Sequence, residues 1–394
     1  MLIEIHMLQN HAPSNLNRDD TGSPKAAVFG DVPRARISSQ CIKRSIRRSK
    51  LFADELGGRL ATRTRRLPEL VRGRLIARGI AEELAEIAAR KVSGLGNRDG
   101  KEQRPENGEY STAQTMFLTD ADIDAVTELM AQVIEESGHD SRELEKVKPA
   151  DLQKDGRLAE QFRPITVDIA LFGRMITSDA FRDADAAMQV AHAISTHRIE
   201  QEYDYFTAVD DLRDSAGSDD AGADMIGDVE FNSACYYKYF SLDVDALVSN
   251  LTGEAVYGRE PEEEEIQDAR RVAADAVAAF LRAAALVTPS GKQNTFAAHQ
   301  PPSLILAEVR ATKTPISYAN AFVKPVKPAN GRGLVEESIA RFAQHVSRLT
   351  AAFNLAASPR LVLEPESELV DLPGVERVPD LDTMAGRLHA VIHG

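Results

Sequence analysis

Residues Arg34–Lys50 read RARISSQCIKRSIRRSK, and this stretch contains seven basic residues and no acidic one. The rest of the chain has the opposite character. The formal net charge of the 394 residues is −14, and the residues outside Val32–Ala53 together carry −21. A concentration of positive charge in one segment of an acidic protein is typical of a site that binds a polyanion. The net charge itself argues against indiscriminate binding of nucleic acid.

The same stretch predicts an amphipathic helix. Ser38 or Ser39 can cap a helix that begins near Gln40, and Ile42 and Ile46 are four residues apart, so they face a core. On the other side, Lys43 with Arg47 and Arg44 with Arg48 form a basic stripe at the same spacing. A solvated helix face is the alternative interpretation. Because like charges at this spacing repel and no acid separates them, the pattern favours anion binding.

On the N-terminal side, Leu2–Leu8 alternates apolar residues with Glu4 and His6, which predicts a strand with one buried face. Gln9–Pro33 is rich in Asn, Asp, Pro and Gly and is predicted to be a long loop. On the C-terminal side, Arg59–Val147 has helical periodicity over Glu82–Lys91 and Asp120–Ser137, and it is interpreted as a helical insertion.

The second half of the chain is predicted to mix strands and helices. Two apolar and aromatic runs, Tyr203–Val209 and Val229–Phe240, flank the acidic segment Asp210–Asp228, which predicts a long hairpin with a flexible acidic tip. Strands are expected at Thr166–Phe172, Ser303–Val309 and Pro315–Phe322, and helices at Asp183–Thr196, Glu262–Leu286 and Glu336–Leu355.

The composition places the chain in a broad class. With 43% hydrophobic and 27% charged residues, it is predicted to be a soluble globular protein of two or three structural units. No apolar run is long enough for a membrane span, and the start lacks the pattern of a secretion signal. Two cysteines without a CxxC pair exclude a disulfide framework. These features together predict a cytoplasmic protein.

Few residues suggest catalysis. His192 and His197 are five apart, whereas a helical metal pair is four apart, so a structural role is favoured. Ser290–Gln293 resembles half a phosphate loop without its first glycine, which excludes a nucleotide site but lets Lys292 contact a phosphate. Asp19, Asp20 and the hairpin aspartates can in principle hold Mg²⁺ for phosphodiester cleavage, although adjacent aspartates in loops usually cap turns. No catalytic residue, metal or cofactor is predicted.

With no catalytic site predicted, the sequence favours a role in binding nucleic acid. Arginine suits bidentate contacts with phosphate, and lysine suits point-charge contacts. Tyr205 and Phe206, in the expected hairpin, can stack on bases or wedge between them, or they can pack in the core.

Several long motifs carry a family resemblance. HAPSNLNRDDTGSPKAAVFG, starting at His11, and RARISSQCIKRSIRRS, starting at Arg34, resemble the N-terminus of the CasC-type backbone subunit of the type I-E CRISPR Cascade complex. VDIALFGRMITS, AHAISTHRIEQEYDYFTAVDDL, GKQNTFAAH and ISYANAF resemble that family in the same order. The resemblance implies an α+β fold with a modified RRM-like (ferredoxin-like) palm, an inserted helical fingers domain and a β-hairpin thumb. The corresponding boundaries are palm 1–58, 165–197 and 241–394, fingers 59–164 and thumb 198–240.

The resemblance also implies a function. Copies of such a subunit polymerise along one CRISPR guide RNA into a helical filament, contact other Cascade subunits and present the guide for pairing with target DNA. The subunit does not cleave, since a separate helicase-nuclease does so. The thumb of one copy folds over the RNA on its neighbour and kinks one base out.

Carried over residue by residue, the family pattern predicts an RNA-binding set and a smaller DNA-binding set. The RNA-binding residues are Arg18, Lys25, Ser38, Gln40, Lys43, Arg44, Arg47, Arg174, Met175, Tyr205, Phe206, Val209 and Lys292. The DNA-binding residues are Arg142, Lys146 and Lys148, interrupted here by Glu143 and Glu145. A tryptophan is familiar at the Tyr205 position, and this chain has none.

Two other functions stay open. One is a metal-dependent RNA endonuclease of a related CRISPR effector, acting through Asp19, Asp20 or the hairpin acids. The other is an RNA-binding regulator that works as a monomer.

Overall fold

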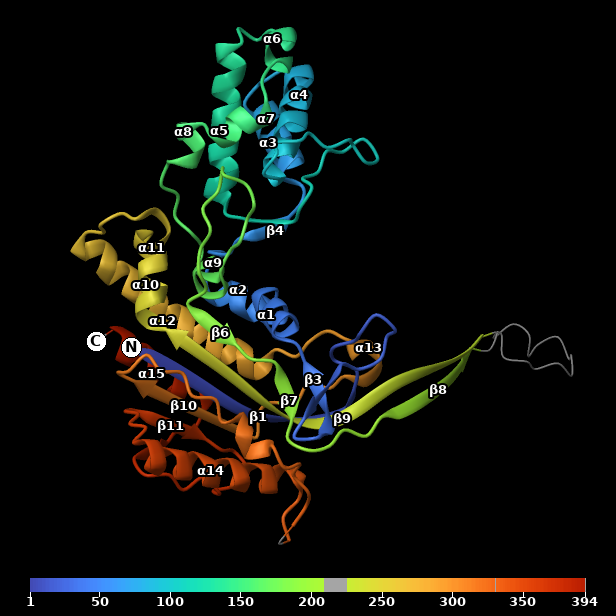
Figure 1. Ribbon diagram of the computed structural model, residues 1–394, viewed down its shortest axis with the longest axis vertical. Helices are drawn as coiled ribbons and strands as arrows, with labels where there is room; N and C mark the ends of the chain where they lie inside the picture. Colours follow the sequence, from blue (N-terminus) through green and yellow to red (C-terminus); the bar gives the residue numbers. More distant parts are fainter. Residues whose placement is uncertain (209–224, 330, 394) are drawn as a thin grey trace, which may run out of the picture. The chain divides into compact units, whose positions relative to one another are not determined.

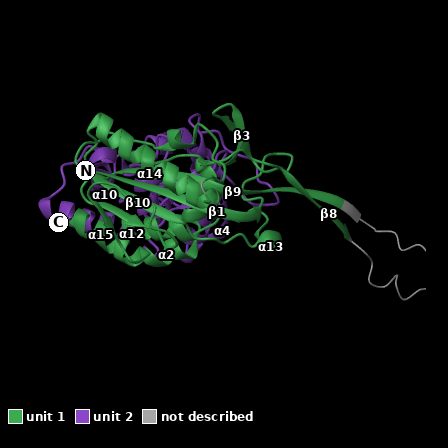
Figure 2. Ribbon diagram, turned by 90° about the horizontal axis from the view of Figure 1, so that it is seen from below, with its two compact units in different colours: residues 1–55, 189–243, 277–394 green, residues 56–188, 244–276 purple. Residues whose placement is uncertain are grey.

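Strand β1 (Leu2–Ser14) lies in the middle of the large sheet that organises the first of two compact units. The computed structural model describes residues 1–208, 225–329 and 331–393. Unit 1 comprises Met1–Glu55, Gln189–Asp243 and Val277–Gly394, and unit 2 comprises Leu56–Met188 and Val244–Ala276; Figure 2 colours them separately.

The sheet of unit 1 is mixed and mostly antiparallel. Its strand order is β12-β11-β10-β1-β9-β7-β3-β2, with β6 and β8 pairing with β9. β1 runs antiparallel to both β9 and β10, whereas β11 and β12 run parallel. The bounds are β2 Ala26–Phe29, β3 Val32–Ile37, β6 Met188–Val190, β7 Ala193–Ser195, β8 Glu202–Ala208, β9 Met225–Asp243, β10 Leu304–Arg310, β11 Arg360–Leu363 and β12 Val375–Arg377.

Helices cover both faces of this sheet. Successive residues of a strand point to opposite faces. Tyr237 and Tyr239 of β9 pack with Phe342 of α14 (Leu334–Phe353), whereas Phe240 packs edge-on against Phe280 of α12 (Glu263–Leu286), with ring centroids 5.1 Å apart. The other helical segments of unit 1 are α1 Ser39–Arg47, α2 Lys50–Glu55, α13 Gln293–Phe296, the 3₁₀ helix η3 Ala319–Phe322 and α15 Leu381–His393 (Figure 1).

The prediction that β1 has one buried face was wrong, because Glu4 and His6 are also fully buried. Glu4 accepts hydrogen bonds from Arg310 at 2.5 Å and from the Tyr239 hydroxyl at 2.6 Å. The charge on this face is therefore compensated inside the core, and the α14 layer can cover it.

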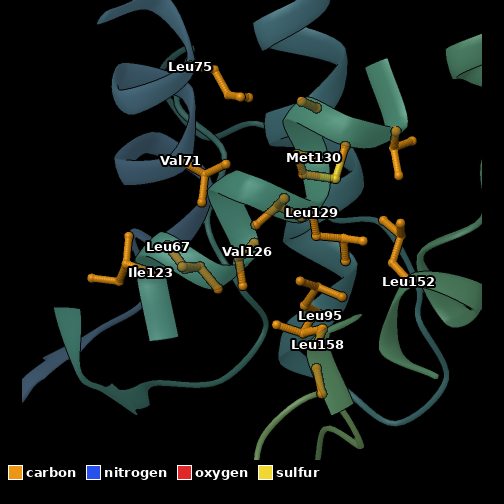
Figure 3. Packing of buried hydrophobic residues seen from close by; sticks show 14 of the residues in the cluster. Leu67, Val71, Leu75, Leu95, Ile123, Val126, Leu129, Met130, Leu152 and Leu158 are labelled. Atoms are coloured by element: carbon orange, nitrogen blue, oxygen red, sulfur yellow. The ribbon is translucent and has the colours of Figure 1, made fainter. Parts of the chain in front are cut away.

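Unit 2 is mainly helical. Its core gathers Val71 and Leu75 of α3 and Val126 and Met130 of α5 in one apolar cluster (Figure 3). Ala88 of α4 belongs to the same cluster. The helical bounds are α3 Leu67–Ala77, α4 Glu82–Ser93, η1 Gly94–Gly96, α5 Asp120–Glu136, α6 Ser141–Glu145, α7 Pro149–Gln153, α8 Gly156–Ala159, α9 Val167–Phe172, α10 Val244–Thr252 and α11 Glu254–Tyr257. β4 (Thr62–Thr64) and β5 (Met116–Leu118) form a two-stranded sheet.

The predicted strand at Thr166–Phe172 is instead helix α9, which ends at Gly173 with φ of 79°. A short apolar run does not distinguish a buried strand from a buried helix. The predicted helix at Asp183–Thr196 is instead strands β6 and β7, because residues of β7 insert between β3 and β9 and tertiary pairing overrides the helical preference of the alanines.

Two further expectations were wrong. The segment predicted as a loop, Gln9–Pro33, contains the end of β1, the whole of β2 and the start of β3. The predicted strand Pro315–Phe322 ends in η3, because the Ile316 and Tyr318 amides donate to the side chains of Glu4 and Tyr237 instead of to a strand.

The longer periodic segments were predicted correctly. The expected helices correspond to α4, α5, α12 and α14, and the expected hairpin corresponds to β8 and β9. The acidic hairpin tip lies largely outside the described residues. The fold is α+β, as predicted. In the described part of the chain, we find no helix with the length and apolar character needed to cross a membrane.

Candidate nucleic-acid interface

Helix α1 forms as its sequence predicts. Ser38 is the N-cap, and its hydroxyl accepts a hydrogen bond from the Cys41 amide at 3.3 Å. Ile42 and Ile46 are buried, so the opposite side of the helix is directed outward. There Lys43 and Arg47 are half-buried, and Arg44, Arg48 and Gln40 are exposed. The predicted one-sided basic stripe is therefore present.

A loop from Asn15 to Lys25 lies beside this helix. Asn17 connects the two, because its side-chain oxygen accepts a hydrogen bond from the Ser38 amide at 2.9 Å. Asn15 fixes the base of the loop by donating to the carbonyls of Gly22 and Glu230, each at 2.9 Å. Arg18 is exposed and Lys25 is half-buried.

A third segment, Ser290–Phe296, approaches the loop closely. A Cβ atom on Gly291 would lie 2.5 Å from the carbonyl oxygens of Asn15 and Leu16, so only glycine fits there. The next residue, Lys292, has a φ of 52° and precedes α13. The half phosphate loop noted in the sequence therefore serves to place Lys292 beside the first loop.

These three segments enclose a cavity of about 580 Å³, which we call the loop–helix cavity. Its lining residues are Leu16, Asn17, Arg18, Asp19, Asp20, Thr21, Gly22, Cys41, Arg44, Ser45, Ser290 and Gly291. Within the described residues, neither Arg18 nor Arg44 forms an ion pair with an acidic side chain. Two unpaired guanidinium groups from separate segments can hold a phosphate between them.

One of the two acidic residues that line the cavity, Asp19, has a structural role. One Asp19 carboxylate oxygen accepts hydrogen bonds from the Thr21 hydroxyl at 2.7 Å, the Thr21 amide at 2.9 Å and the Ser23 amide at 3.0 Å. The Thr21 hydroxyl, followed by these amides, lowers the pKa of Asp19. Asp19 thus stabilises the turn that presents Arg18.

A possible metal group lies elsewhere in unit 1. In the described ranges, Glu4, His6 and Glu308 are the three residues whose ligand atoms come within reach of one ion. Burial raises the pKa of Glu308, but His6, Arg310 and Arg360 outweigh it and lower the value to about 2. Both glutamates are already engaged by the Arg310 guanidinium, so this group is a buried ion-pair network.

Arg34 does not belong to the surface of the basic segment. Its side chain is fully buried, and its guanidinium donates to the carbonyls of Phe29 at 3.1 Å, Ser195 at 3.1 Å and Phe322 at 2.8 Å. Burial lowers the pKa of Arg34. The sequence placed Arg34 among the seven basic residues of the predicted anion-binding segment, and the structure corrects this. Arg34 instead holds β3 against its neighbours.

The β8–β9 hairpin extends from the sheet as a two-stranded ribbon (Figure 1). Tyr205 is 64% exposed and Phe206 is 38% exposed. Gly227 is the cross-strand partner of Phe206, and a Cβ at Gly227 would lie 2.6 Å from the Phe206 ring. Glycine therefore provides the space for that ring. Val209 lies outside the described residues.

Arg174 and Met175 differ sharply in exposure. The Arg174 side chain is buried and donates to Asp122 at 2.7 Å and to the Arg182 carbonyl at 2.9 Å. Met175 is 89% exposed. The arrangement suits Arg174 to fix the turn and Met175 to contact a ligand, and the RNA-binding role of both stays a prediction.

The predicted DNA-binding residues are on the surface of unit 2. Arg142, Lys146 and Lys148 are all exposed. Lys146 forms an ion pair with Glu143 at 2.7 Å, so part of its charge is compensated locally. The role of these residues in binding DNA stays a prediction.

The two histidines considered as metal ligands have other partners. The Nδ1 atom of His192 lies 3.0 Å from the Arg36 guanidinium, and the Nε2 atom of His197 accepts a hydrogen bond from the Cys235 amide at 3.3 Å. Both interactions are consistent with the structural role that their spacing favours.

Sequence reasoning missed Asn15, Asn17 and Gly291 as parts of the site. All three lie in motifs that carry the family resemblance, which was the available signal. Asn15 and Gly291 make contacts between segments more than 200 residues apart, and Asn17 contacts Ser38 from another element, so local patterns do not report these contacts.

The family model described as CT1975-like protein matches residues 3–383. The chain belongs to the CT1975-like protein family. A chain in a solved structure described as "CRISPR RNA-guided surveillance complex, pre-nicking" is 29% identical over the full length of both chains, with a TM-score of 0.79. A chain in a second structure, described as "CRISPR RNA-guided surveillance complex", is 25% identical, with a TM-score of 0.70, and the match covers 99% of this chain and 100% of that one.

No curated protein matched the chain. The family match and the structural similarities confirm the resemblance to CasC-type subunits. The CT1975-like fold therefore extends over the two units described above.

Proposed function

We propose that this CT1975-like protein is a non-catalytic, cytoplasmic subunit that binds CRISPR guide RNA. On this proposal, copies polymerise along the guide to form the backbone of a type I-E Cascade complex, contact its other subunits and present the guide to target DNA. Unit 1 supplies most of an RRM-like palm and a thumb, the β8–β9 ribbon, and residues 59–164 of unit 2 supply the fingers.

The observation that carries the proposal is the loop–helix cavity. Arg18 and Arg44, from segments separated in sequence, line one cavity without acidic partners among the described residues, and Lys43 lies on the outer side of the same helix. Such an arrangement holds phosphates without reading bases, which suits a protein that must accept any guide sequence.

Similarity to chains of RNA-guided surveillance complexes supports the same function over the whole chain. The engagement of Asp19 in its own turn supports a binding role over metal-dependent cleavage, since one of its carboxylate oxygens already accepts three hydrogen bonds.

The test combines the protein with CRISPR RNA and Mg²⁺ and uses electron microscopy and gel analysis of the RNA. We expect a regular filament and intact RNA, and we expect Lys43→Glu with Arg44→Glu to abolish the filament. Single bound copies without a filament would favour a monomeric regulator. Periodic RNA fragments that disappear with Asp20→Ala would contradict the non-catalytic role.

A further inference from the structure

The β8 strand presents a second exposed aromatic residue that the family pattern does not assign. Tyr203 and Tyr205 are each 64% exposed, which is unusual for side chains of this size. Because they are two residues apart on one strand, both point to the same face of the ribbon. Within the described residues, neither ring stacks on another aromatic side chain.

The spacing of the two rings fits one base. A strand rises about 3.3 Å per residue, so residues two apart are separated by about 6.6 Å along the strand. Stacked bases are about 3.4 Å apart, and one base between two rings needs twice that distance. The backbone spacing of Tyr203 and Tyr205 therefore matches the spacing that two rings need to hold a single flat ring between them.

The residues across the ribbon favour a base over a phosphate. The register places Glu230 opposite Tyr203 and Asp228 opposite Tyr205, and directly opposed residues share a face. Carboxylates repel phosphate oxygens but accept hydrogen bonds from the N–H groups of bases. The charges on this face therefore favour the base of a nucleotide over its phosphate.

Phe206 is on the other face of the ribbon. It is opposite Gly227 and lies over that glycine, so it is not a third member of the tyrosine pair. The two faces of the ribbon thus carry distinct aromatic surfaces, and each can contact a different part of an RNA.

We propose that Tyr203 and Tyr205 form a clamp that holds one unstacked nucleobase of the bound RNA between their rings. The inference rests on the proposed guide-RNA function, and it adds Tyr203 as a second ring beside Tyr205, which the family resemblance already assigns to the RNA.

The test measures the affinity of the full chain for a labelled single-stranded RNA by fluorescence anisotropy. The variants are Tyr203→Ala, Tyr203→Phe and, as a matched control from the opposite face, Asp204→Ala. Because one base stack on an aromatic ring is lost, Tyr203→Ala should lower affinity about tenfold, with an unchanged salt dependence. Tyr203→Phe and Asp204→Ala should stay within about twofold of the unmodified protein.

A second arm identifies the ligand as a base. A single abasic nucleotide is moved along the RNA, and at the clamped position it should weaken binding by about the same factor as Tyr203→Ala. Because the abasic nucleotide and Tyr203→Ala remove the same contact, the two changes together should lower the RNA affinity no more than either change alone. Thermal unfolding of each variant verifies that the chain is folded.

The outcomes are distinguishable. If the unmodified protein does not bind RNA, the proposed function itself fails. If it binds and Tyr203→Ala binds equally well, only the clamp is overturned. The clamp is also overturned if Tyr203→Phe weakens binding as much as Tyr203→Ala, or if abasic and Tyr203→Ala losses multiply at every position.

Discussion

Replacing Lys43 and Arg44 together by glutamine should remove a defined part of the salt dependence of RNA binding. Both residues lie on the outer side of α1, whose inner side is fixed by Ile42 and Ile46. Glutamine is a good helix former, so the helix should persist while two positive charges are lost. The change therefore probes phosphate contacts without disturbing the fold.

The size of the effect follows from counterion release. Each phosphate contact with a single strand contributes about −0.7 to the slope of log affinity against log salt. If every predicted basic contact of unit 1 is made, the slope is about −4, and affinity falls about 300-fold between about 50 and 200 mM salt. Those contacts are Arg18, Lys25, Lys43, Arg44, Arg47 and Lys292. The double variant should have a slope of about −2.8 and lose only about 50-fold over the same range.

The assay is fluorescence anisotropy with a short single-stranded RNA titrated at several salt concentrations. The charge-matched control is Arg74→Gln with Arg78→Gln, because these arginines of unit 2 are already paired with Asp124 at 2.6 Å and Glu128 at 2.8 Å. An unchanged slope in the Lys43 and Arg44 variant would refute the reasoning. So would an equal reduction in the control, because the effect would then reflect net charge alone.

Three further outcomes are expected. Arg34→Met should lower the free energy of unfolding by about 3–5 kcal/mol in urea titration, because it leaves buried carbonyls without a donor, whereas exposed Arg48→Met should change it by less than about 0.5 kcal/mol. Gly291→Ala should lower the free energy of unfolding by about 1–3 kcal/mol and weaken RNA binding, since the added methyl group would clash with backbone oxygens. An RNA affinity and a melting temperature equal to those of the unmodified protein would contradict this. Burial and the charge of Lys238 lower the pKa of His11 to about 4, so the unfolded chain takes up this proton below about pH 6.5 while the folded chain does not. Stability should therefore fall by up to about 3 kcal/mol between about pH 6.5 and 4, and the fall should be smaller in His11→Gln by chemical denaturation across pH.

Local features were predictable and long-range ones were not. The cap and buried face of α1 follow from spacing within nine residues, and the structure has both. Thr166–Phe172 and Asp183–Thr196 were assigned wrongly because their conformation is decided by neighbours far along the chain. In the site, the sequence predicted that Arg18 and Arg44 bind RNA. It could not predict that both line one cavity, because the cavity depends on the contact of Gly291 with the first loop.

The arginines show why composition alone cannot locate a binding surface. Arg34 and Arg310 are buried and hold backbone or carboxylate groups, and Arg74 is neutralised by an acid on the surface. Arg18 and Arg44, by contrast, form no ion pair within the described residues, and they line one cavity. Since screening limits charge effects to about 10 Å, these local cations can attract phosphate in a chain whose net charge is −14.

The acids of the β8–β9 ribbon have the converse effect. Asp228 and Glu230, which share a face with the tyrosines, disfavour phosphate there, so on our proposals the two surfaces divide one RNA. Backbone goes to α1, and an unstacked base goes to the ribbon. On these proposals, α1 binds the phosphates of every nucleotide sequence alike, and Tyr203 and Tyr205 are a place where a preference for a particular base can arise.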